Sequence, residues 1–444
     1  MQVRNGQELM LSNFRQRKPT FVLAFVVGLL SACTSPSRHH WGDRAFIRYW
    51  DPPVGAEGKT RVAVKDIIDL RGEVTTVGSE YFSKWGHPAK QDADCLKYLR
   101  QKNVCLVGKT NLNELALGTS GVNEYFGTPK NSLDQGIGLM PGGSSSGCAV
   151  AVADNRADIA IGTDTAGSIR TPAACCGVCG LKTTFGLVSL KGVYPLSPKH
   201  LDTVGPMAKD IPRLVEGMEL LKPGFSSEYE KAVATTPERP RIVVGRLRIP
   251  GTDPAIDRAV DDALEAADFA VVPLNPDFTA AWLEAERHGR ILAMADGYAS
   301  NKHLLSEKGI TPTTKAAILL GRLERGSKIY QETLKRRPAW QAMLDRTFQK
   351  VDFIALPTLK QQPYKIPWIG RHALFEAKAL TLQNTTAVNY SGNPALAVPV
   401  PLKEERMPVT SLQLIGPLRS EASLLNAGRI VVEGAAAKAT FSSR

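Results

Sequence analysis

The chain contains, at residues 159–170, the stretch Ile-Ala-Ile-Gly-Thr-Asp-Thr-Ala-Gly-Ser-Ile-Arg, in which a short apolar run leads into a turn of small residues. The run Ile159–Ile161 predicts a buried β-strand. A small-residue turn that leaves such a strand can expose one side chain together with several backbone N–H groups, as a nucleophile and its oxyanion hole require. Ser168 is the candidate nucleophile in this turn.

This turn is not a G-x-S-x-G elbow, and no histidine lies near it in the sequence. A Ser-His-Asp triad therefore stays open only through histidines that are distant in the chain. These are His200, His288, His303 and His372.

A second turn, at residues 141–147, has the sequence Pro-Gly-Gly-Ser-Ser-Ser-Gly. A phosphate-binding loop is one interpretation, but no Gly-Lys-Ser/Thr follows. Gly136-Ile137-Gly138 begins a dinucleotide fingerprint, but Pro141 stands where the third glycine is needed. A flexible linker does not suit the strongly apolar segments on both sides. The serines of this turn are instead expected to present hydroxyl groups to a reacting carbonyl.

A proton acceptor is predicted at Lys65. This lysine directly follows Arg61–Val64, which is a short apolar strand candidate. Burial at the end of a strand disfavours the ammonium form, so a lysine there can lose its proton and act as a base. For a single lysine considered alone, the alternative is a solvated surface charge.

Strand and helix patterns alternate along the rest of the chain, which favours an α/β layer fold with one large sheet. A helix capped by Asp92 is expected to run to Asn103, with Cys95, Leu96 and Leu99 on one face. The other expected helices are 146–153, one from Pro254, 279–300 and 313–349. The other expected strands are Val104–Val107, Arg241–Val244, Phe269–Val272, Ile354–Leu356, Ala395–Val398 and Ser411–Ile415. Residues 223–240 are interpreted as a connection within one domain.

The composition is that of an ordinary globular protein. The 444 residues are 43% hydrophobic and 22% charged, which excludes a disordered chain, a collagen and a polytopic membrane protein. The net charge is +12 and the isoelectric point is about 9.3. That excess allows an anionic partner, but no run of five basic residues appears, so diffuse surface charge is the preferred explanation. No nucleic-acid partner is predicted.

The first 33 residues have the features of an export signal. Arg15, Arg17 and Lys18 precede an apolar run, 21–32, that is too short to span a bilayer. The run ends in Leu-Ser-Ala-Cys, which resembles a bacterial lipobox and implies cleavage before Cys33 and lipidation of its thiol. A plain signal peptide or an uncleaved anchor are the alternatives. The expected domains are a signal peptide at 1–32, a tether and N-terminal segment at 33–60, and one catalytic domain at 61–435.

The seven cysteines are too sparse for a secreted disulfide framework. Cys176 and Cys179 form a C-x-x-C, but a zinc site would need a second pair and the sequence has none. Buried free thiols are therefore expected, and no metal site is predicted.

Three motifs in this order resemble the amidase signature family. They are VAVKDIIDLRGEVTTVGS from Val62, MPGGSSSGCAVAVA from Met140, and IGTDTAGSIRTPAACCGVCGLK from Ile161. Weaker echoes are Gly-Asn-Pro-Ala at 392–395 and Leu-Gln-Leu-Ile-Gly-Pro at 412–417. The resemblance implies an α/β fold with a large mixed β-sheet core flanked by helices on both faces.

The resemblance also assigns the site. Ser168 would be the acyl-accepting nucleophile, Ser144 the bridging serine after a cis Gly143–Ser144 peptide, and Lys65 the final base. Backbone N–H groups of the Ser168 turn would form the oxyanion hole, from Thr165, Ala166, Gly167 and Ser168 itself. Three residues would support the site, namely Ser145, Asp164 and Arg170. No metal or organic cofactor is implied.

Some residues depart from the family pattern. Ala166 replaces the usual glycine before Gly167, and its methyl group restricts positive φ and is expected to crowd the turn, so that Ala166→Gly would raise the rate. Thr184 stands where proline is usual, and the stretch 399–405 lacks the usual Gly-rich turn. The region 223–390, which would shape the substrate pocket, carries no recognisable match.

The preferred function is an amidase, exported to the periplasm and lipid-anchored to a bacterial membrane, that hydrolyses a small-molecule or peptide amide through a Ser-Ser-Lys triad and an acyl-enzyme. One alternative is the glutaminase (A) subunit of a tRNA-dependent amidotransferase, which shares all three motifs but works beside a cytoplasmic partner. Another is a catalytically silent lipoprotein that binds amides or peptides. The sequence does not determine the oligomeric state or the substrate.

Overall fold

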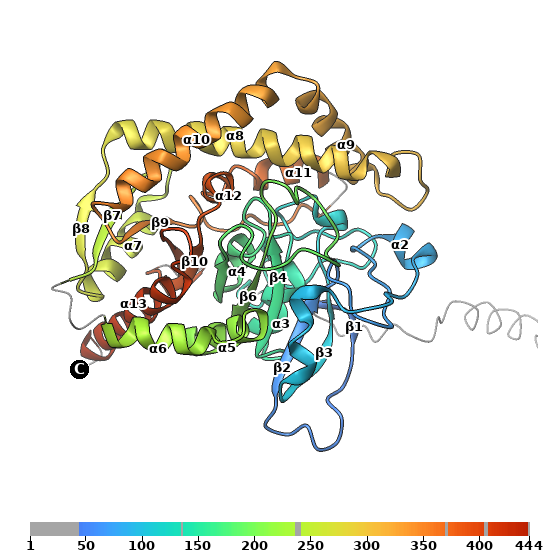
Figure 1. The fold of residues 1–444 in the computed structure, drawn as a ribbon, viewed down its shortest axis with the longest axis horizontal. Helices are drawn as coiled ribbons and strands as arrows, with labels where there is room; N and C mark the ends of the chain where they lie inside the picture. Colours follow the sequence, from blue (N-terminus) through green and yellow to red (C-terminus); the bar gives the residue numbers. More distant parts are fainter. Residues whose placement is uncertain (1–43, 135, 236–240, 369–371, 404–406, 443–444) are drawn as a thin grey trace, which may run out of the picture. The chain divides into compact units, whose positions relative to one another are not determined.

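A mixed sheet of eleven strands forms the centre of the fold (Figure 1). The computed structural model describes residues 44–134, 136–235, 241–368, 372–403 and 407–442, without the side chains of 438–442. The predicted signal segment and Cys33 lie outside the described residues. The strands are β1 (Phe46–Tyr49), β2 (Thr60–Lys65), β3 (Val104–Thr110), β4 (Ile159–Asp164), β5 (Cys179–Lys182), β6 (Thr203–Ala208), β7 (Val243–Arg246), β8 (Ala270–Pro273), β9 (Phe353–Pro357), β10 (Ala395–Pro401) and β11 (Val409–Ile415).

The strand order is β1-β3-β2-β4-β6-β5-β10-β11-β9-β7-β8. β2 runs parallel to both β3 and β4, and β7 runs parallel to β8 and β9. The strands between these two groups pair antiparallel, from β4 through β6, β5, β10 and β11 to β9. The large mixed sheet that the family resemblance implied is therefore confirmed.

Helices cover both faces of the sheet. The α-helices are α2 (Glu80–Trp85), α3 (Ser146–Ala153), α4 (Arg170–Cys176), α5 (Ile211–Leu221), α6 (Phe225–Thr235), α7 (Pro254–Ala266), α8 (Pro276–Asn301), α9 (Pro312–Arg325), α10 (Lys328–Phe348), α11 (His372–Ala379), α12 (Thr386–Ser391) and α13 (Glu421–Ser442). In the part of the chain that the structure describes, no helix is long and apolar enough to cross a membrane.

Side-chain alternation along β4 explains why both faces are covered. Ile159 and Ile161 point into the core beneath α5, where they join Leu214, whereas Ala160 points to the opposite face and joins Val150 of α3. Successive residues of a strand face opposite sides of a sheet, so a strand that is buried on both faces needs cover on each side. All six residues of β4 are buried.

The predicted α-helix from Asp92 to Asn103 is wrong. The segment forms two short 3₁₀ turns, Asp94–Leu96 and Leu99–Gln101. The Asp92 carboxylate does not cap a helix, because it accepts a hydrogen bond from the backbone N–H of Arg71 (2.8 Å) and pairs with Arg100. The apolar face predicted for this segment is nevertheless buried.

One other predicted helix is also divided differently. The expected helix 313–349 is divided at Gly326 into α9 and α10, because Ser327 caps α10 by accepting a hydrogen bond from the N–H of Tyr330 (3.2 Å). The stretch 223–240, interpreted as a connection within one domain, contains helix α6, a feature that the sequence analysis did not predict. Its charged side chains belong to a helix that packs against α5 and α13.

The central strands β5 and β6 were not predicted. Their sequences, Cys-Gly-Leu-Lys and Thr-Val-Gly-Pro-Met-Ala, contain glycine, proline and lysine, which are uncommon inside strands. Both strands are fully buried, and they connect the parallel half of the sheet around β2 and β4 to β10. Without them the two halves of the sheet could not be joined.

Candidate active site

Strands β2 and β4 bring the predicted base close to the serine turn at 141–147. The parallel register pairs Val64 with Ile161, so the carboxyl ends of the two strands lie at the same edge. Lys65 is the last residue of β2 and is completely buried. Its Nζ donates hydrogen bonds to Ser144 Oγ (2.7 Å) and to Thr163 Oγ1 of β4 (2.9 Å).

The surroundings of Lys65 favour the neutral amine form of its side chain. Burial removes the water that would stabilise the ammonium, and this lowers its pKa to about 7, although the charges of Asp164 and Asp202 act in the opposite direction. At neutral pH a substantial fraction of Lys65 therefore has a free lone pair. A lysine in this state can accept a proton from a neighbouring hydroxyl group.

Ser144 is held by hydrogen bonds on both sides of its peptide. The Gly143–Ser144 bond is cis, as the resemblance implied. The N–H of Gly143 donates to the carbonyl of Thr119 (2.7 Å), and the carbonyl of Ser144 accepts from the N–H of Asn113 (3.3 Å). The loop that contains Asn113 and Thr119 thus fixes the position of the Ser144 peptide.

Glu376 of α11 holds the loop at 113–120 through hydrogen bonds. Its carboxylate accepts hydrogen bonds from Asn113 Nδ2 (2.9 Å), from the N–H of Thr119 (2.8 Å), and from the N–H (3.1 Å) and hydroxyl group of Ser120. Burial raises the pKa of Glu376, while these hydrogen bonds act to lower it. No motif in the sequence indicates this role, because Glu376 lies more than 250 residues beyond its partners.

Ser145 connects the two serine turns. Its backbone N–H donates to the carbonyl of Ser168 (3.1 Å), and its hydroxyl group donates to the carbonyl of Thr163 (3.2 Å). Ser168 lies just before α4 and keeps 8% of its surface exposed. The two predicted serines, Ser144 and Ser168, therefore belong to loops that are in direct contact through Ser145.

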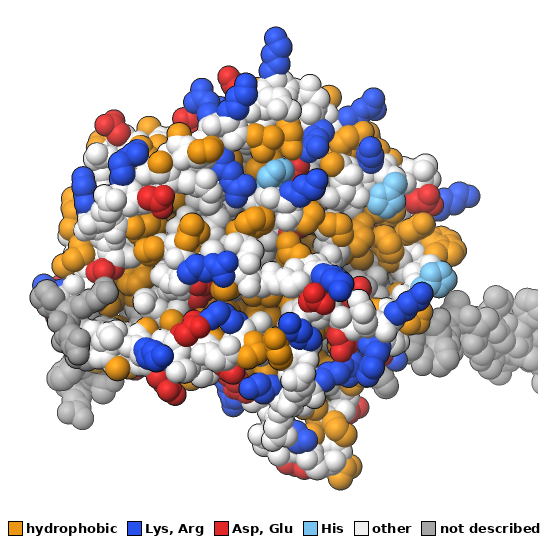
Figure 2. Space-filling model, in the orientation of Figure 1, with side chains coloured by type: hydrophobic (Ala, Val, Ile, Leu, Met, Phe, Trp, Pro, Cys, Tyr) orange, Lys and Arg blue, Asp and Glu red, His pale blue; other side chains and the backbone are white. Residues whose placement is uncertain are grey.

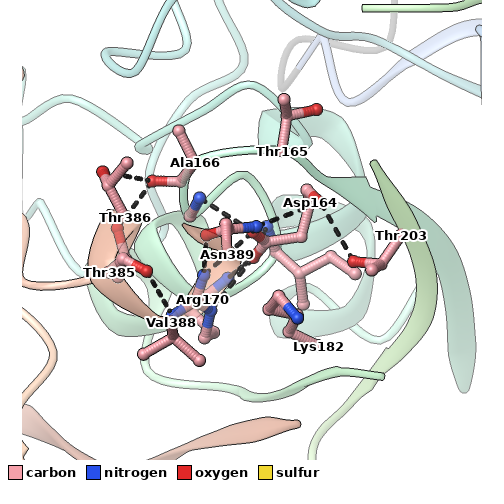
Figure 3. A network of polar contacts seen from close by, with 12 residues as sticks. Asp164, Thr165, Ala166, Arg170, Lys182, Thr203, Thr385, Thr386, Val388 and Asn389 are labelled. Carbon is pink, nitrogen blue, oxygen red and sulfur yellow. Dashed lines mark hydrogen bonds and ion pairs between the residues drawn. The ribbon is translucent and has the colours of Figure 1, made fainter. Parts of the chain in front are cut away.

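A buried ion pair holds the Ser168 turn in shape (Figure 3). Arg170 and Asp164 are fully buried and pair at 2.9 Å. Asp164 also accepts from the N–H groups of Gly167 (2.8 Å) and Ile169 (3.1 Å), which closes the turn around its carboxylate. Burial would raise the pKa of Asp164, but the positive charge of Arg170 and its hydrogen bonds outweigh that effect and lower the pKa well below its usual range. Asp164 is thus an anion with a structural position rather than a proton acceptor.

Arg170 of this ion pair also contacts residues that are distant in the chain. Arg170 donates to Asn389 Oδ1 (2.6 Å), to the carbonyl of Thr385 (3.0 Å) and to Gln413 Oε1 (2.6 Å). The Thr385 hydroxyl group donates to the carbonyl of Ala166 (2.7 Å), as Figure 3 shows. The sequence did not predict these partners, whose polar side chains are buried only because the tertiary fold surrounds Arg170.

The predicted oxyanion hole needs one correction. The N–H of Gly167 is occupied, since it donates to Asp164. Among the described residues, none accepts a hydrogen bond from the N–H of Thr165, Ala166 or Ser168. Ala166 does not have a positive φ, so its backbone conformation does not require glycine.

Lys182 is a second buried lysine, which the sequence motifs did not single out. Burial, assisted by the positive charge of Arg170, lowers its pKa to about 7. Its Nζ donates to the carbonyls of Asn393 (2.8 Å) and Thr183 (3.0 Å), so both contacts are with backbone. It therefore joins β5 to the segment before β10 rather than contacting a serine.

Three of the four candidate histidines have partners away from the serines, and the fourth, His303, is exposed. His200 contacts Asp296 (2.6 Å), His288 contacts Thr333 (2.7 Å) and His372 pairs with Glu124 (3.2 Å). Within the described ranges, no histidine is hydrogen-bonded to Ser144 or Ser168. The geometry around the serines thus places Lys65, and not an imidazole, within reach of a hydroxyl proton.

The cysteines lie in the core. Burial raises the pKa of the Cys179 thiol to about 12 and that of the Cys148 thiol to about 11. The cysteines that the structure describes are all free and buried. Across the described residues, no group of three or more His, Cys, Asp or Glu side chains is arranged to hold a metal ion.

Comparison with known proteins identifies the family of the chain. The family model described as "Amidase" matches residues 61–425, and this chain belongs to that family. Its relatives include the A subunit of glutamyl-tRNA(Gln) amidotransferase from Archaeoglobus fulgidus, which is 31% identical over 400 residues and covers 84% of this chain and 85% of the relative.

Solved structures are similar as well. The crystal structure of the A subunit of glutamyl-tRNA(Gln) amidotransferase from Thermotoga maritima is 25% identical, with a TM-score of 0.70 over 87% of this chain and 86% of that one. A crystal structure named as an amidase is 27% identical, with a TM-score of 0.69 over 84% of each chain. The chain is therefore an amidase-signature protein in both sequence and fold.

Proposed function

We propose that this protein hydrolyses a carboxylic amide through Ser168, Ser144 and Lys65. The observation that carries the proposal is the 2.7 Å hydrogen bond between Lys65 Nζ and Ser144 Oγ, made by a lysine whose burial favours the neutral amine. A serine hydroxyl group is a weak nucleophile until a neighbour removes its proton. Ser144 would transmit that proton from Ser168 to Lys65.

In the proposed first step, Ser168 Oγ attacks the amide carbon while its proton moves to Ser144 Oγ and the Ser144 proton moves to the Lys65 amine. The oxygen that gains negative charge would receive hydrogen bonds from the free N–H groups of the turn, at Thr165, Ala166 and Ser168. The Lys65 ammonium then returns a proton through Ser144 to the leaving nitrogen, and the C–N bond breaks. The products are an acyl-Ser168 ester and free ammonia or amine.

In the second step, a water molecule loses its proton to the same relay and attacks the acyl ester. Ser168 leaves as its alkoxide and recovers a proton from Lys65 through Ser144. The acid is released and the resting state returns. Asp164 and Arg170 act only by holding the turn, since their charges pair with each other.

A second candidate is the function of an amidotransferase A subunit. Such a subunit releases ammonia from a primary amide, and the ammonia is transferred to a substrate that a partner protein binds. The names of the relatives favour it, because eight of them that share 29–32% identity over 82–85% of this chain carry that name. The same Lys65–Ser144–Ser168 chemistry would serve both functions. The stand-alone amidase rests on the N-terminal sequence instead, for which we propose export, cleavage before Cys33 and lipid attachment there.

One experiment separates these candidates. The chain from Cys33 onward is purified without partners and assayed for ammonia release from glutamine, asparagine and a set of aliphatic and aromatic amides. A stand-alone amidase turns over at least one of them at a catalytic rate, and Ser168→Ala abolishes that turnover. No turnover, combined with covalent labelling of Ser168 by a fluorophosphonate, favours the partner-dependent enzyme. A chain that neither turns over amides nor reacts with the probe is the silent binder.

A further inference from the structure

Helix α9 packs against α8 along one face. Thr314, Ile318 and Gly321, at positions i, i+4 and i+7, are buried. A Cβ atom placed on Gly321 would lie 2.2 Å from the carbonyl oxygen of Met294 in α8, so the two helices are in close contact there. These contacts fix which face of α9 points inward, and its opposite face points away from α8.

That outward face carries leucines. Leu319, Leu320 and Leu323 have 47%, 53% and 72% of their surface exposed. A surface helix of a globular protein usually turns its leucines toward the core and its polar residues to water. Neighbouring exposed apolar side chains mark contact with another molecule.

Basic residues accompany these leucines. Residues 312–348, which form α9 and α10, contain eight basic and three acidic residues, and hence a net charge of +5 out of +12 for the whole chain. Figure 2 shows Lys and Arg side chains gathered over these two helices at the top of the view. Lys315, Leu319, Arg322 and Leu323 occupy positions i, i+4, i+7 and i+8, so cations and leucines share one helix face.

Several of these cations are unpaired. Arg325 pairs with Asp296, and Arg336 with Glu284. In contrast, none of the described acidic residues forms an ion pair with four other basic residues of these helices, which are Lys315, Arg322, Lys328 and Lys335. Their charge is available to an anionic partner.

We propose that the outward face of α9, formed by Lys315, Leu319, Leu320, Arg322 and Leu323, docks on an anionic phospholipid surface. Leucines beside unpaired cations suit the boundary between acyl chains and acidic headgroups. Docking of a second copy through the same face would bring two positively charged surfaces together, and these would repel each other. The contact would be peripheral and is independent of the proposed amide hydrolysis.

The test places an environment-sensitive fluorophore on this face. Leu323→Cys is introduced into the full chain carrying Cys33→Ser and labelled with a nitrobenzoxadiazole dye, since the described native cysteines are buried. We expect a blue shift on vesicles of phosphatidylcholine with phosphatidylglycerol, and partitioning about tenfold stronger than on phosphatidylcholine alone. Lys315→Glu with Arg322→Glu should weaken that partitioning by about tenfold, as should high salt.

The control label is Val54→Cys in the same background. Val54 is fully exposed, and the loop between β1 and β2 lies at the bottom of the view in Figure 1, far from α9. Its fluorophore should not shift. Circular dichroism and thermal unfolding verify that each variant is folded.

Three results would overturn the inference. They are an unchanged spectrum of the Leu323 label on acidic vesicles, an equal shift of the Val54 label, and a concentration-dependent shift of the Leu323 label without lipid. The last result would assign the face to a second copy of this chain.

Discussion

Replacing Thr163 by valine tests the electrostatics of the Lys65 site. Thr163 Oγ1 accepts a hydrogen bond from Lys65 Nζ at 2.9 Å, and both side chains are buried. Valine has nearly the same shape as threonine but cannot accept that hydrogen bond. The variant therefore removes one of the two hydrogen bonds that stabilise the Lys65 ammonium and leaves the contact with Ser144 in place.

The size of the effect follows from the energy of that hydrogen bond. A buried hydrogen bond to a charged group contributes about 1.5–3 kcal/mol, and one pKa unit corresponds to about 1.4 kcal/mol. The pKa of Lys65, already lowered to about 7 by burial, should therefore fall by about one to two further units in Thr163→Val. Because the neutral amine is the active form, activity should persist to lower pH than in the native protein.

The assay is the pH dependence of kcat/KM on the best amide, or of the rate at which a fluorophosphonate labels Ser168. The acidic limb should move down by about one to two pH units, with a lower plateau because a weaker base accepts protons less readily. Thr163→Ser, which keeps the hydroxyl group, is the matched control and should keep the native profile. An acidic limb that stays in place or moves upward in Thr163→Val would refute the assignment of Lys65 as the titrating base.

Three other substitutions give separate tests. Glu376→Gln should lower kcat by about ten- to hundredfold with little change in the unfolding temperature, because the loop that holds Ser144 loses its carboxylate anchor; an unaffected kcat would contradict this. Ala166→Gly should change kcat/KM by no more than about twofold, since Ala166 does not need positive φ, and a large increase would show that its methyl group does crowd the turn. Lys65→Met should reduce the rise of stability between pH 7 and 10.5, measured by urea unfolding. Between these pH values, Lys65 binds a proton in the unfolded native chain but not in the folded one, so stability rises with pH. Lys182 makes a similar contribution, which the Lys65→Met variant retains. An unchanged dependence of stability on pH in Lys65→Met would contradict the lowered pKa of Lys65.

The three motifs predicted which strands and turns carry the chemistry because these features are local. The apolar run before Lys65 and the run before the Ser168 turn each appear as a strand in the sequence, and they are neighbours in the sheet. The small residues of 141–147 indicate a tight turn, and the structure has a bend at 143–145 with a cis Gly143–Ser144 peptide. A pattern of this kind is visible without any knowledge of the tertiary fold.

The partners of these residues could not be predicted in the same way. Thr163 looks like any other strand residue until the parallel register places it beside Lys65. Glu376 and Asn389 contact residues more than 200 positions away, so nothing in their own sequence surroundings marks them. Strands β5 and β6 were missed because their glycine and proline residues suit loops, and burial between other strands overrides that preference.

The central claim is that Lys65 acts on Ser168 through Ser144, and covalent labelling of Ser168 tests it most directly. The intact mass of the protein is measured after reaction with a fluorophosphonate, and the modified peptide is sequenced. The account predicts one adduct, on Ser168, which is absent in Ser168→Ala. The rate of labelling should fall by orders of magnitude in both Lys65→Ala and Ser144→Ala, and the double variant should react little more slowly than the slower single variant. Rapid labelling of Ser168 in Lys65→Ala, together with its loss on substitution of His200, His288, His303 or His372, would contradict the account and assign the proton transfer to a histidine.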